Sequence, residues 1–199
     1  MPLPIQCQMG MRAVILDGSV QDEMAPAREA AGAYLGERGY QVEIIKLREK
    51  EIGDCLGCFG CWVKTPGECV VKDDGLAVVR SYVLADVQVL LSPITFGGYS
   101  YHLKKVLDRS ICRDLPFFQV IGGEMHHPIR YQKDRRTVFI GRLPRRDRDS
   151  QAVFLALVER NTHNFRPKGW SSALVFGDEN ADLTNIAVRE ALIKAGVKE

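Results

Sequence analysis

Apolar residues along this chain gather into five short runs, separated by stretches with helical spacing of apolar positions. Runs of this length, bounded by turn residues, predict strands that are covered on both faces. The predicted strands cover residues 11–19, 40–47, 87–94, 137–141 and 172–177. The predicted helices, whose apolar residues fall on one face, cover residues 23–38, 73–85, 100–112, 149–163 and 182–195.

Strands that alternate with helices predict an α/β fold, because parallel strands need crossover connections on both faces of the sheet. We predict a flavodoxin-like, doubly wound, five-stranded parallel sheet in the order 2-1-3-4-5. In such sheets ligands bind beyond the carboxyl ends of the strands, near the point where the strand order reverses. The loops after the first three strands are therefore the ones to search for function.

The length of 199 residues suits a single domain over residues 1–199. We expect residues 1–10 to be an N-terminal extension and residues 113–136 to be an irregular insertion with a turn at Gly122-Gly123. The net charge of +2 gives no reason to expect nucleic acid as a partner. The chain shows neither an apolar run of membrane-spanning length nor a signal peptide, so we expect a cytoplasmic protein without a membrane partner.

Four of the six cysteines lie close together in the loop after the second strand. Cys55, Cys58 and Cys61 have the spacing C-x2-C-x2-C, and Cys69 follows after seven more residues. In a reducing compartment such a group favours metal binding or redox chemistry over a disulfide framework. Phe59 and Trp62 instead favour a packed loop that contributes to a neighbouring subunit or a ligand edge, so both interpretations stay open.

The loop after the third strand reads SPITFGGYS. Pro93 fixes the exit of the chain from the strand, and Gly97-Gly98 allow the backbone to approach something flat and close. Ile94 and Phe96 offer apolar surface, and Ser100 is a suitable cap for the next helix. A plain helix-entry loop is the alternative, because these residue types punctuate many such loops.

Together these motifs resemble a known family. The patterns CxGCxxCW, PGxCVxKDD and SPxTFGGYSxxLKxxLDRS are similar to those of the NADPH-dependent FMN reductases and multimeric flavodoxin-like proteins, which include the iron-sulfur flavoproteins. The resemblance covers residues 11–112 and implies an FMN-dependent oxidoreductase that passes electrons from NAD(P)H to a small-molecule or protein acceptor. It also implies a homodimer or homotetramer. It assigns no catalytic side chain, and it gives Lys104 and Asp108-Arg109 structural or interface roles.

The resemblance also implies residues for each cofactor. The flavin ring would lie along Pro93, Ile94, Thr95, Phe96 and Gly97. A [4Fe–4S] cluster, if this chain is an iron-sulfur electron carrier, would be held by Cys55, Cys58, Cys61 and Cys69. Relatives of this kind that keep several of these cysteines without a cluster leave a cluster-free loop as the alternative.

The loop after the first strand departs from the family pattern. It reads DGSVQDEM, in which Ser19 and Gln21 can donate hydrogen bonds to the phosphate of FMN. Asp22 and Glu23 would repel a phosphate, and Asp22 is able to cap the helix and occupy its free N–H groups. The alternative to a flavoenzyme is therefore a flavin-free scaffold of the same fold with a binding or regulatory role.

Residues 130–149 carry eight basic side chains and three acidic ones. This segment suits the 2′-phosphate of NADPH, an acidic redox protein or a neighbouring subunit, although a solvated face is the more frequent role of such a run. Neither a G-x-G-x-x-G motif after a strand nor a G-x-x-x-x-G-K-[ST] motif is present. A separate dinucleotide-binding domain and a P-loop nucleotidase are therefore not expected.

Overall fold

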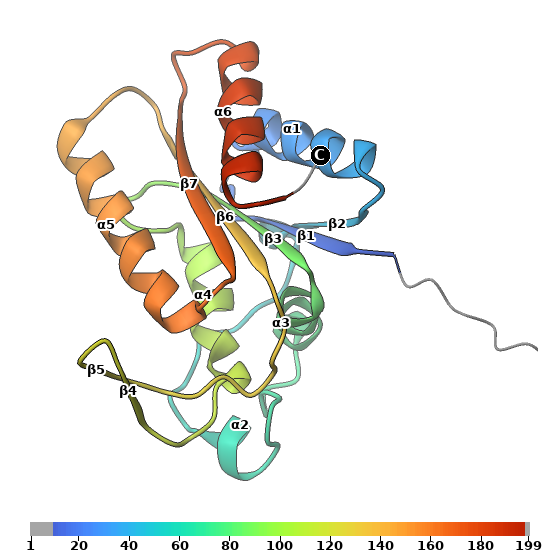
Figure 1. The fold of residues 1–199 in the computed structure, drawn as a ribbon, viewed down its shortest axis with the longest axis vertical. Coiled ribbons are helices and arrows are strands. Elements are labelled where there is room, and N and C mark those ends of the chain that lie inside the picture. The colour runs from blue at the N-terminus through green and yellow to red at the C-terminus, as the bar shows by residue number, and fades with distance from the viewer. Residues whose placement is uncertain (1–9, 198–199) are drawn as a thin grey trace, which may run out of the picture.

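The computed structural model describes residues 10–197, in which helices cover both faces of a five-stranded parallel sheet (Figure 1). The strands are β1 (Arg12–Asp17), β2 (Gln41–Lys46), β3 (Val87–Pro93), β6 (Arg136–Leu143) and β7 (Gly169–Phe176). Their order is β2-β1-β3-β6-β7, which is the predicted order 2-1-3-4-5 among the strands of this sheet. The flavodoxin-like prediction is confirmed. The predicted extension over residues 1–10 falls, except for Gly10, outside the described residues.

Two groups of helices enclose the sheet. Helices α1 (Ala25–Glu37) and α6 (Ala181–Lys194) cover one face. Helices α3 (Asp74–Leu84), α4 (Tyr101–Arg109) and α5 (Arg148–Phe165) cover the other face. No helix within residues 10–197 is long and apolar enough to cross a membrane.

Each strand of the centre contributes side chains to both cores, because successive residues of a strand point to opposite faces. In β1, Ala13 and Ile15 pack under α1 and α6, while Val14 and Leu16 pack under α3 and α4. All four side chains are buried. This is why the strand reads as one continuous apolar run in the sequence.

The last strand begins earlier than predicted. β7 starts at Gly169 rather than at residue 172, since Gly169, Trp170 and Ser171 pair with the first residues of β6. Backbone hydrogen bonds of a sheet do not depend on an apolar side chain, so the apolar pattern alone misses these residues.

The prediction of an irregular segment over residues 113–136 is wrong in part. A short antiparallel hairpin forms from β4 (Gln119–Ile121) and β5 (Glu124–His126). Its turn lies at Gly122 and Gly123 as predicted, and both residues have positive φ angles, which suit the tight turns of hairpins. The described residues also include three short helices. They are the 3-10 helices Leu47–Glu49 and Ser110–Arg113, and α2 (Gly60–Val63) in the cysteine loop.

Candidate functional site

The loops after β1 and β3 are bonded to each other at the carboxyl edge of the sheet. The N–H of Gly18 donates to the carbonyl of Leu91 at 2.9 Å, and Ser100 Oγ donates to the carbonyl of Gly18 at 2.7 Å. A Cβ on Gly18 would lie 2.7 Å from Ser100 Oγ, so only glycine fits. Ser100 also caps α4, as predicted, by accepting from the N–H of Leu103. The two loops therefore form one surface where this fold binds ligands.

The loop after β3 ends in a tight turn over residues 95–98. Thr95 and Gly98 exchange backbone hydrogen bonds of 3.1 and 2.9 Å. Between them, Phe96 and Gly97 have φ angles of 50° and 74°, which define a turn with two left-handed central residues. A Cβ on Gly97 would lie 2.5 Å from Val153 Cγ1 of α5, so the turn rests directly on that helix. The aromatic ring of Phe96 is fully exposed at the tip.

The five residues expected along a flavin ring are not equally available. Thr95 and Phe96 are exposed, Pro93 and Ile94 are partly buried, and Gly97 is buried. The side chain of Ile94 lies over Gly141, where an added Cβ would meet its Cδ1 at 2.8 Å. A flat ligand would therefore meet the backbone of the turn, Thr95 and Phe96 rather than the side chain of Ile94.

Ser19 is buried and its hydroxyl has internal partners. Its Oγ donates to the carboxylate of Asp17 and accepts from the N–H of Met24 at 3.2 Å. Asp17 is itself buried at the end of β1 and accepts from Arg28 at 2.5 Å. A phosphate contact of Ser19 stays a prediction that requires this hydroxyl to leave Asp17. Gln21, the other predicted phosphate ligand, is exposed.

Glu23 occupies the free N–H groups of this loop. Its carboxylate accepts from the N–H of Val20 at 3.0 Å and from the N–H of Gln21 at 2.6 Å. The expectation that Asp22 caps the helix is wrong. Asp22 has a φ of 71° and its carboxylate turns away to pair with guanidinium groups, and the residue before α1 is Met24, which makes no side-chain cap.

Charges in this loop are balanced between acidic and basic groups. Asp22 pairs with Arg28 at 2.5 Å and with Arg48 at 2.9 Å. The hydrogen bond from Arg28, above all, holds the pKa of Asp22 below its ordinary value. Partial burial alone would raise the pKa of Glu23, but the backbone N–H groups and nearby Arg142 lower it on balance. Both carboxylates are therefore charged at neutral pH.

The fit to FMN differs between its two ends. The ring end of the site fits as it stands, because the turn at Thr95-Phe96 is exposed and lined by backbone. The phosphate end fits only when Glu23 leaves the N–H groups of Val20 and Gln21.

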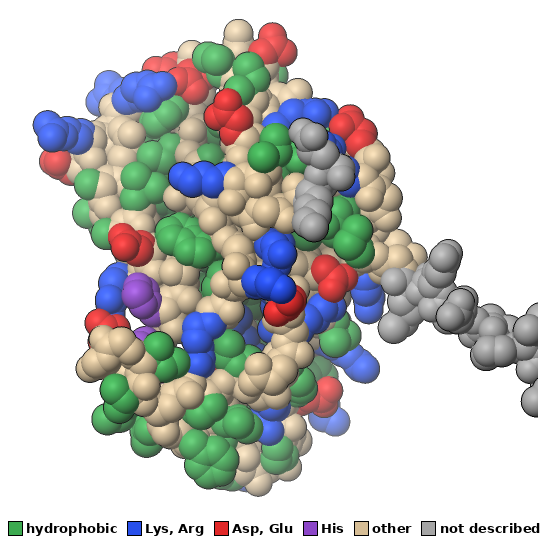
Figure 2. Space-filling view, in the orientation of Figure 1, with side chains coloured by type: hydrophobic (Ala, Val, Ile, Leu, Met, Phe, Trp, Pro, Cys, Tyr) green, Lys and Arg blue, Asp and Glu red, His purple; other side chains and the backbone are tan. Residues whose placement is uncertain are grey.

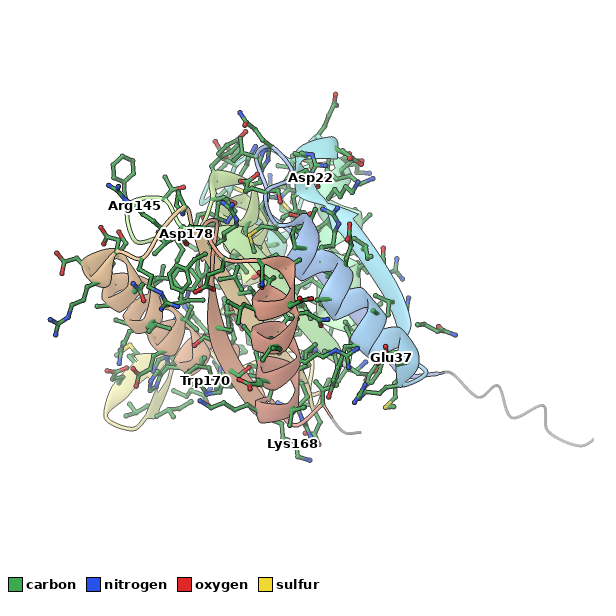
Figure 3. All side chains as sticks on the ribbon, turned by 90° about the horizontal axis from the view of Figure 1, so that it is seen from above. Asp22, Glu37, Arg145, Lys168, Trp170 and Asp178 are labelled. Carbon is green, nitrogen blue, oxygen red and sulfur yellow. The ribbon has the colours of Figure 1, made fainter. Side chains whose placement is uncertain are left out.

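The basic segment over residues 130–149 does not form one patch. β6 runs through it, so Lys133 and Arg135 lie at the amino end of the sheet, whereas Arg142 and Arg145 lie at the carboxyl end. Figure 3 shows this polarity, with Asp22, Arg145 and Asp178 at one end of the molecule and Lys168 and Trp170 at the other. Only the part of the basic segment near Arg142 lies at the carboxyl end of the sheet, where the loops after β1 and β3 lie.

The cysteine loop exposes some of its thiols and buries others. Cys55 and Cys58 are exposed, Cys69 is intermediate and Cys61 is buried. Burial, and then the neighbouring thiols of the other three, raise the pKa of Cys61. Among residues 10–197, no three His, Cys, Asp or Glu side chains converge as metal ligands do. The other three thiols lie near enough to affect the pKa of Cys61, and a [4Fe–4S] cluster held by the four cysteines stays a prediction.

Trp62 joins the cysteine loop to the insertion over residues 113–136. Its Nε1 donates to the carbonyl of Asp114 at 3.0 Å, and its ring lies 4.9 Å from the rings of Phe59 and His127. These contacts show the packing that was expected of the loop, and its contribution to a neighbouring subunit or a ligand edge stays a prediction. Beside this junction, a cavity of about 370 Å³ is lined by residues that include Cys69, Cys112 and Tyr131. This cavity includes none of the predicted flavin residues.

An apolar surface covers the same end of the molecule, as Figure 2 shows over α2 and the hairpin. Its side chains are between 51% and 75% exposed. They are Leu56, Phe59, Val63, Phe117, Phe118, Val120 and Met125.

Arg109 holds the base of the cysteine loop and is buried. Its guanidinium pairs with Asp73 at 2.5 Å and donates to the carbonyls of Gly53 and Val71. Burial alone would raise the pKa of Asp73, but Arg109 and the N–H of Gly53 hold it below its ordinary value. The side chain of Asp73 also caps α3. Arg109 is thus a structural residue.

Sequence reasoning missed Glu23 as the acceptor and Asp17 as the buried anchor of Ser19. Both make side-chain bonds to groups two or three residues away, and these bonds follow no periodic pattern. The short spacing of acidic residues around a helix start was the available signal, and it pointed to Asp22 instead.

The sheet order and the paired loops after β1 and β3 define a flavodoxin-like protein with its ligand surface at the carboxyl edge. Residues 11–154 match the NADPH-dependent FMN reductase family over most of the chain, and the chain belongs to that family.

Relatives similar to this chain include iron-sulfur flavoproteins of two archaea. One from Methanocaldococcus jannaschii is 37% identical over 103 residues, which are 50% of this chain and 52% of the relative. One from Archaeoglobus fulgidus is 38% identical over 72 residues, which are 36% of this chain and 34% of the relative. The chain thus spans between a third and about half of the length of these two relatives.

Solved structures of reductases share the fold. An NAD(P)H:quinone oxidoreductase from Methanothermobacter marburgensis superposes with a TM-score of 0.64 at 15% identity, over 91% of this chain and 94% of its own. An azoreductase from Bacillus anthracis superposes with a TM-score of 0.66 at 13% identity, over 94% of this chain and 98% of its own. At such identities the likeness concerns the fold.

Proposed function

We propose that the protein is an FMN-dependent oxidoreductase that accepts electrons from NAD(P)H and passes them to a small-molecule or protein acceptor. One observation carries the proposal: in a chain of the FMN reductase family, the exposed turn at Thr95-Phe96 is bonded through Ser100 to the loop after β1. The relatives and the quinone oxidoreductase that share its sequence or fold support the same class of chemistry.

In this proposal the chain binds and orients the flavin. The backbone of residues 95–98, with Thr95 and Phe96, forms the surface for the ring. Gln21 receives the phosphate end, together with the N–H groups of the β1 loop once Glu23 leaves them. A bound flavin supplies the hydride-accepting ring. The protein therefore needs no side chain that acts as acid or base.

Arg142, Arg145, Arg146 and Arg148 supply positive charge beside this surface. Arg145 and Arg148 are exposed, and Arg146 pairs with Glu179 at 2.5 Å. We assign the exposed arginines to the phosphate groups of NAD(P)H, because guanidinium groups bind phosphate through paired hydrogen bonds.

Titration of the protein with FMN, followed by flavin fluorescence, tests the binding step. Phe96→Ser removes the exposed ring at the tip of the turn and is expected to weaken FMN binding about tenfold, a typical loss for one aromatic contact. Ile186→Ser removes an exposed apolar side chain of α6, outside both the site and the apolar surface, and is expected to leave FMN binding unchanged. Equal affinity of both variants and the wild type would contradict the assignment of the turn.

A second candidate function is that of an iron-sulfur flavoprotein, an electron carrier that uses Cys55, Cys58, Cys61 and Cys69. The C-x2-C-x2-C-x7-C spacing and the names of the relatives favour it. Iron analysis of protein purified without oxygen decides this point. A cluster protein would hold about four irons per chain and lose them in Cys58→Ser, whereas iron-free wild type excludes this candidate.

A third candidate is a flavin-free scaffold, which the contact of Glu23 with the phosphate loop favours. The double variant Asp22→Ser/Glu23→Thr separates it from the flavoenzyme. If the variant binds FMN and the wild type does not, the natural chain is a scaffold. If the wild type binds FMN, the scaffold is excluded.

We also propose that a second copy of this chain covers the apolar surface defined above. A contiguous apolar surface on a monomer is limited in size, and larger ones mark protein interfaces. Homodimers and homotetramers are the expected assemblies.

A further inference from the structure

Glu23 contacts the loop after β1 in the way that an anionic ligand would. Its two carboxylate oxygens accept from two successive backbone N–H groups, those of Val20 and Gln21, at 3.0 and 2.6 Å. Successive backbone N–H groups in a turn form concave sites that bind anions such as phosphate. In this chain the donors already have a negatively charged partner from the same loop.

The surroundings keep Glu23 in place. Arg142 lies close enough to lower the pKa of Glu23, and the two side chains line one cavity of about 120 Å³ together with Glu179. Glu179 forms an ion pair with Arg146. Asp22, which also faces this loop, is paired with Arg28 and Arg48.

The phosphate of a flavin gains little binding free energy from such a loop. To reach the N–H groups of Val20 and Gln21 it must displace a carboxylate that makes two hydrogen bonds, and charge-assisted bonds of this kind are strong. The displaced carboxylate then lies beside a phosphate of the same sign, which opposes binding. Riboflavin ends in a hydroxyl group, so it need not displace the carboxylate and is not repelled by its charge.

We propose that Glu23 determines the flavin specificity of this site: it competes with the terminal phosphate, so that FMN and riboflavin bind with similar affinity. The inference rests on the proposed function, because it concerns the flavin of that site. It adds a residue that selects among flavins by the chemistry of their chain end.

Dissociation constants for FMN and for riboflavin, measured by flavin fluorescence, test the proposal on four forms of the protein. The wild type is expected to bind the two flavins within about tenfold of each other. Glu23→Gln removes the charge and is expected to bind FMN about tenfold more tightly, the value of one charge-assisted hydrogen bond, with riboflavin unchanged. Glu23→Ser, which also frees both N–H groups, should show the same gain.

Glu29→Gln is the matched control. Glu29 is exposed on α1, so its substitution makes the same change of net charge without touching the loop, and it should alter neither constant. A wild type that prefers FMN by more than about a hundredfold, an energy of about 2.7 kcal/mol, would overturn the proposal and leave the proposed function standing. So would Glu23 variants with unchanged FMN affinity. If no form binds either flavin, the proposal and the proposed function fall together.

Discussion

Two adjacent glycines in the loop after β3 have very different surroundings. Gly97 has a φ of 74° and lies against Val153, whereas Gly98 has no positive φ and an added Cβ would meet only the carbonyl of Thr95 at 3.5 Å. The sequence predicts both as points of close backbone approach. Of these two positions in the structure, only that of Gly97 requires a residue without a side chain.

We therefore expect Gly97→Ala to lower the free energy of unfolding by about 2 kcal/mol, through left-handed strain and the contact with Val153. It should also weaken FMN binding, because the turn must shift away from α5. Chemical denaturation and the FMN titration measure the two effects. Gly98→Ala is the control, and an equal loss in both variants would show that the geometry of Gly97 has no special role.

At this scale the sequence predicted residues that act through backbone geometry or capping, such as Gly97 and Ser100. It did not predict Glu23, since two hydrogen bonds within an irregular loop depend on the path of the backbone and leave no periodic signal.

Among the elements, α4 links the loops after β1 and β3 to the cysteine loop. Its first turn is capped by Ser100 beside Gly18, and its last turn carries Arg109, which binds Asp73 and the carbonyl of Gly53. A substitution at the end of α4 is therefore expected to alter the structure at the base of the cysteine loop.

Arg109→Met is expected to lower the free energy of unfolding by about 3 kcal/mol, because it leaves Asp73 without its buried partner. Lys104→Met on the same helix breaks an exposed pair with Asp108 and should have almost no effect. Chemical denaturation of both variants measures this. A small loss in Arg109→Met would contradict the structural role of the pair.

The same pair predicts a dependence on pH. The pKa of Asp73 is lower in the folded protein than its ordinary value of 3.8. Its contribution to stability is therefore complete above that ordinary value and is lost as the pH falls through the lower, folded value. We expect the stability difference between wild type and Asp73→Asn to be constant near neutral pH and to shrink below pH 3.8. A difference that grows with acid would contradict this sign.

The main sheet and its helices were predictable because their apolar periodicity is strong. The hairpin of β4 and β5 was not, since strands of three residues are too short to show alternation and expose Val120 and Met125. The hairpin instead contacts α5, which lies far away in the chain: Arg160 pairs with Glu124 at 2.7 Å, and His126 Nδ1 lies 3.0 Å from Asn164 Oδ1.

Viewed as a whole, the molecule builds its ligand surface and its apolar surface from different residues. The loops after β1 and β3 form the ligand surface, and the apolar surface lies over α2 and the hairpin (Figure 2). Assembly through the apolar surface would therefore use residues other than those proposed to hold the flavin.

The double variant Phe118→Ser/Val120→Thr is expected to shift the assembly to the monomer, because it removes apolar area from the centre of the proposed interface. Analytical ultracentrifugation measures the mass. Ile186→Thr, on the exposed side of α6, is the control and should keep the wild-type mass. An assembly that is unchanged in the double variant would place the interface elsewhere.

The proposed function requires that this chain uses a bound flavin to accept electrons from NAD(P)H. Anoxic addition of NADPH, and separately of NADH, to protein loaded with FMN tests this, with the visible absorption of the flavin followed over time. We expect the absorption to bleach with at least one of the two donors and to return when an acceptor such as a quinone is added. Protein that binds FMN but never bleaches it, or that binds no FMN at all, would rule out this function.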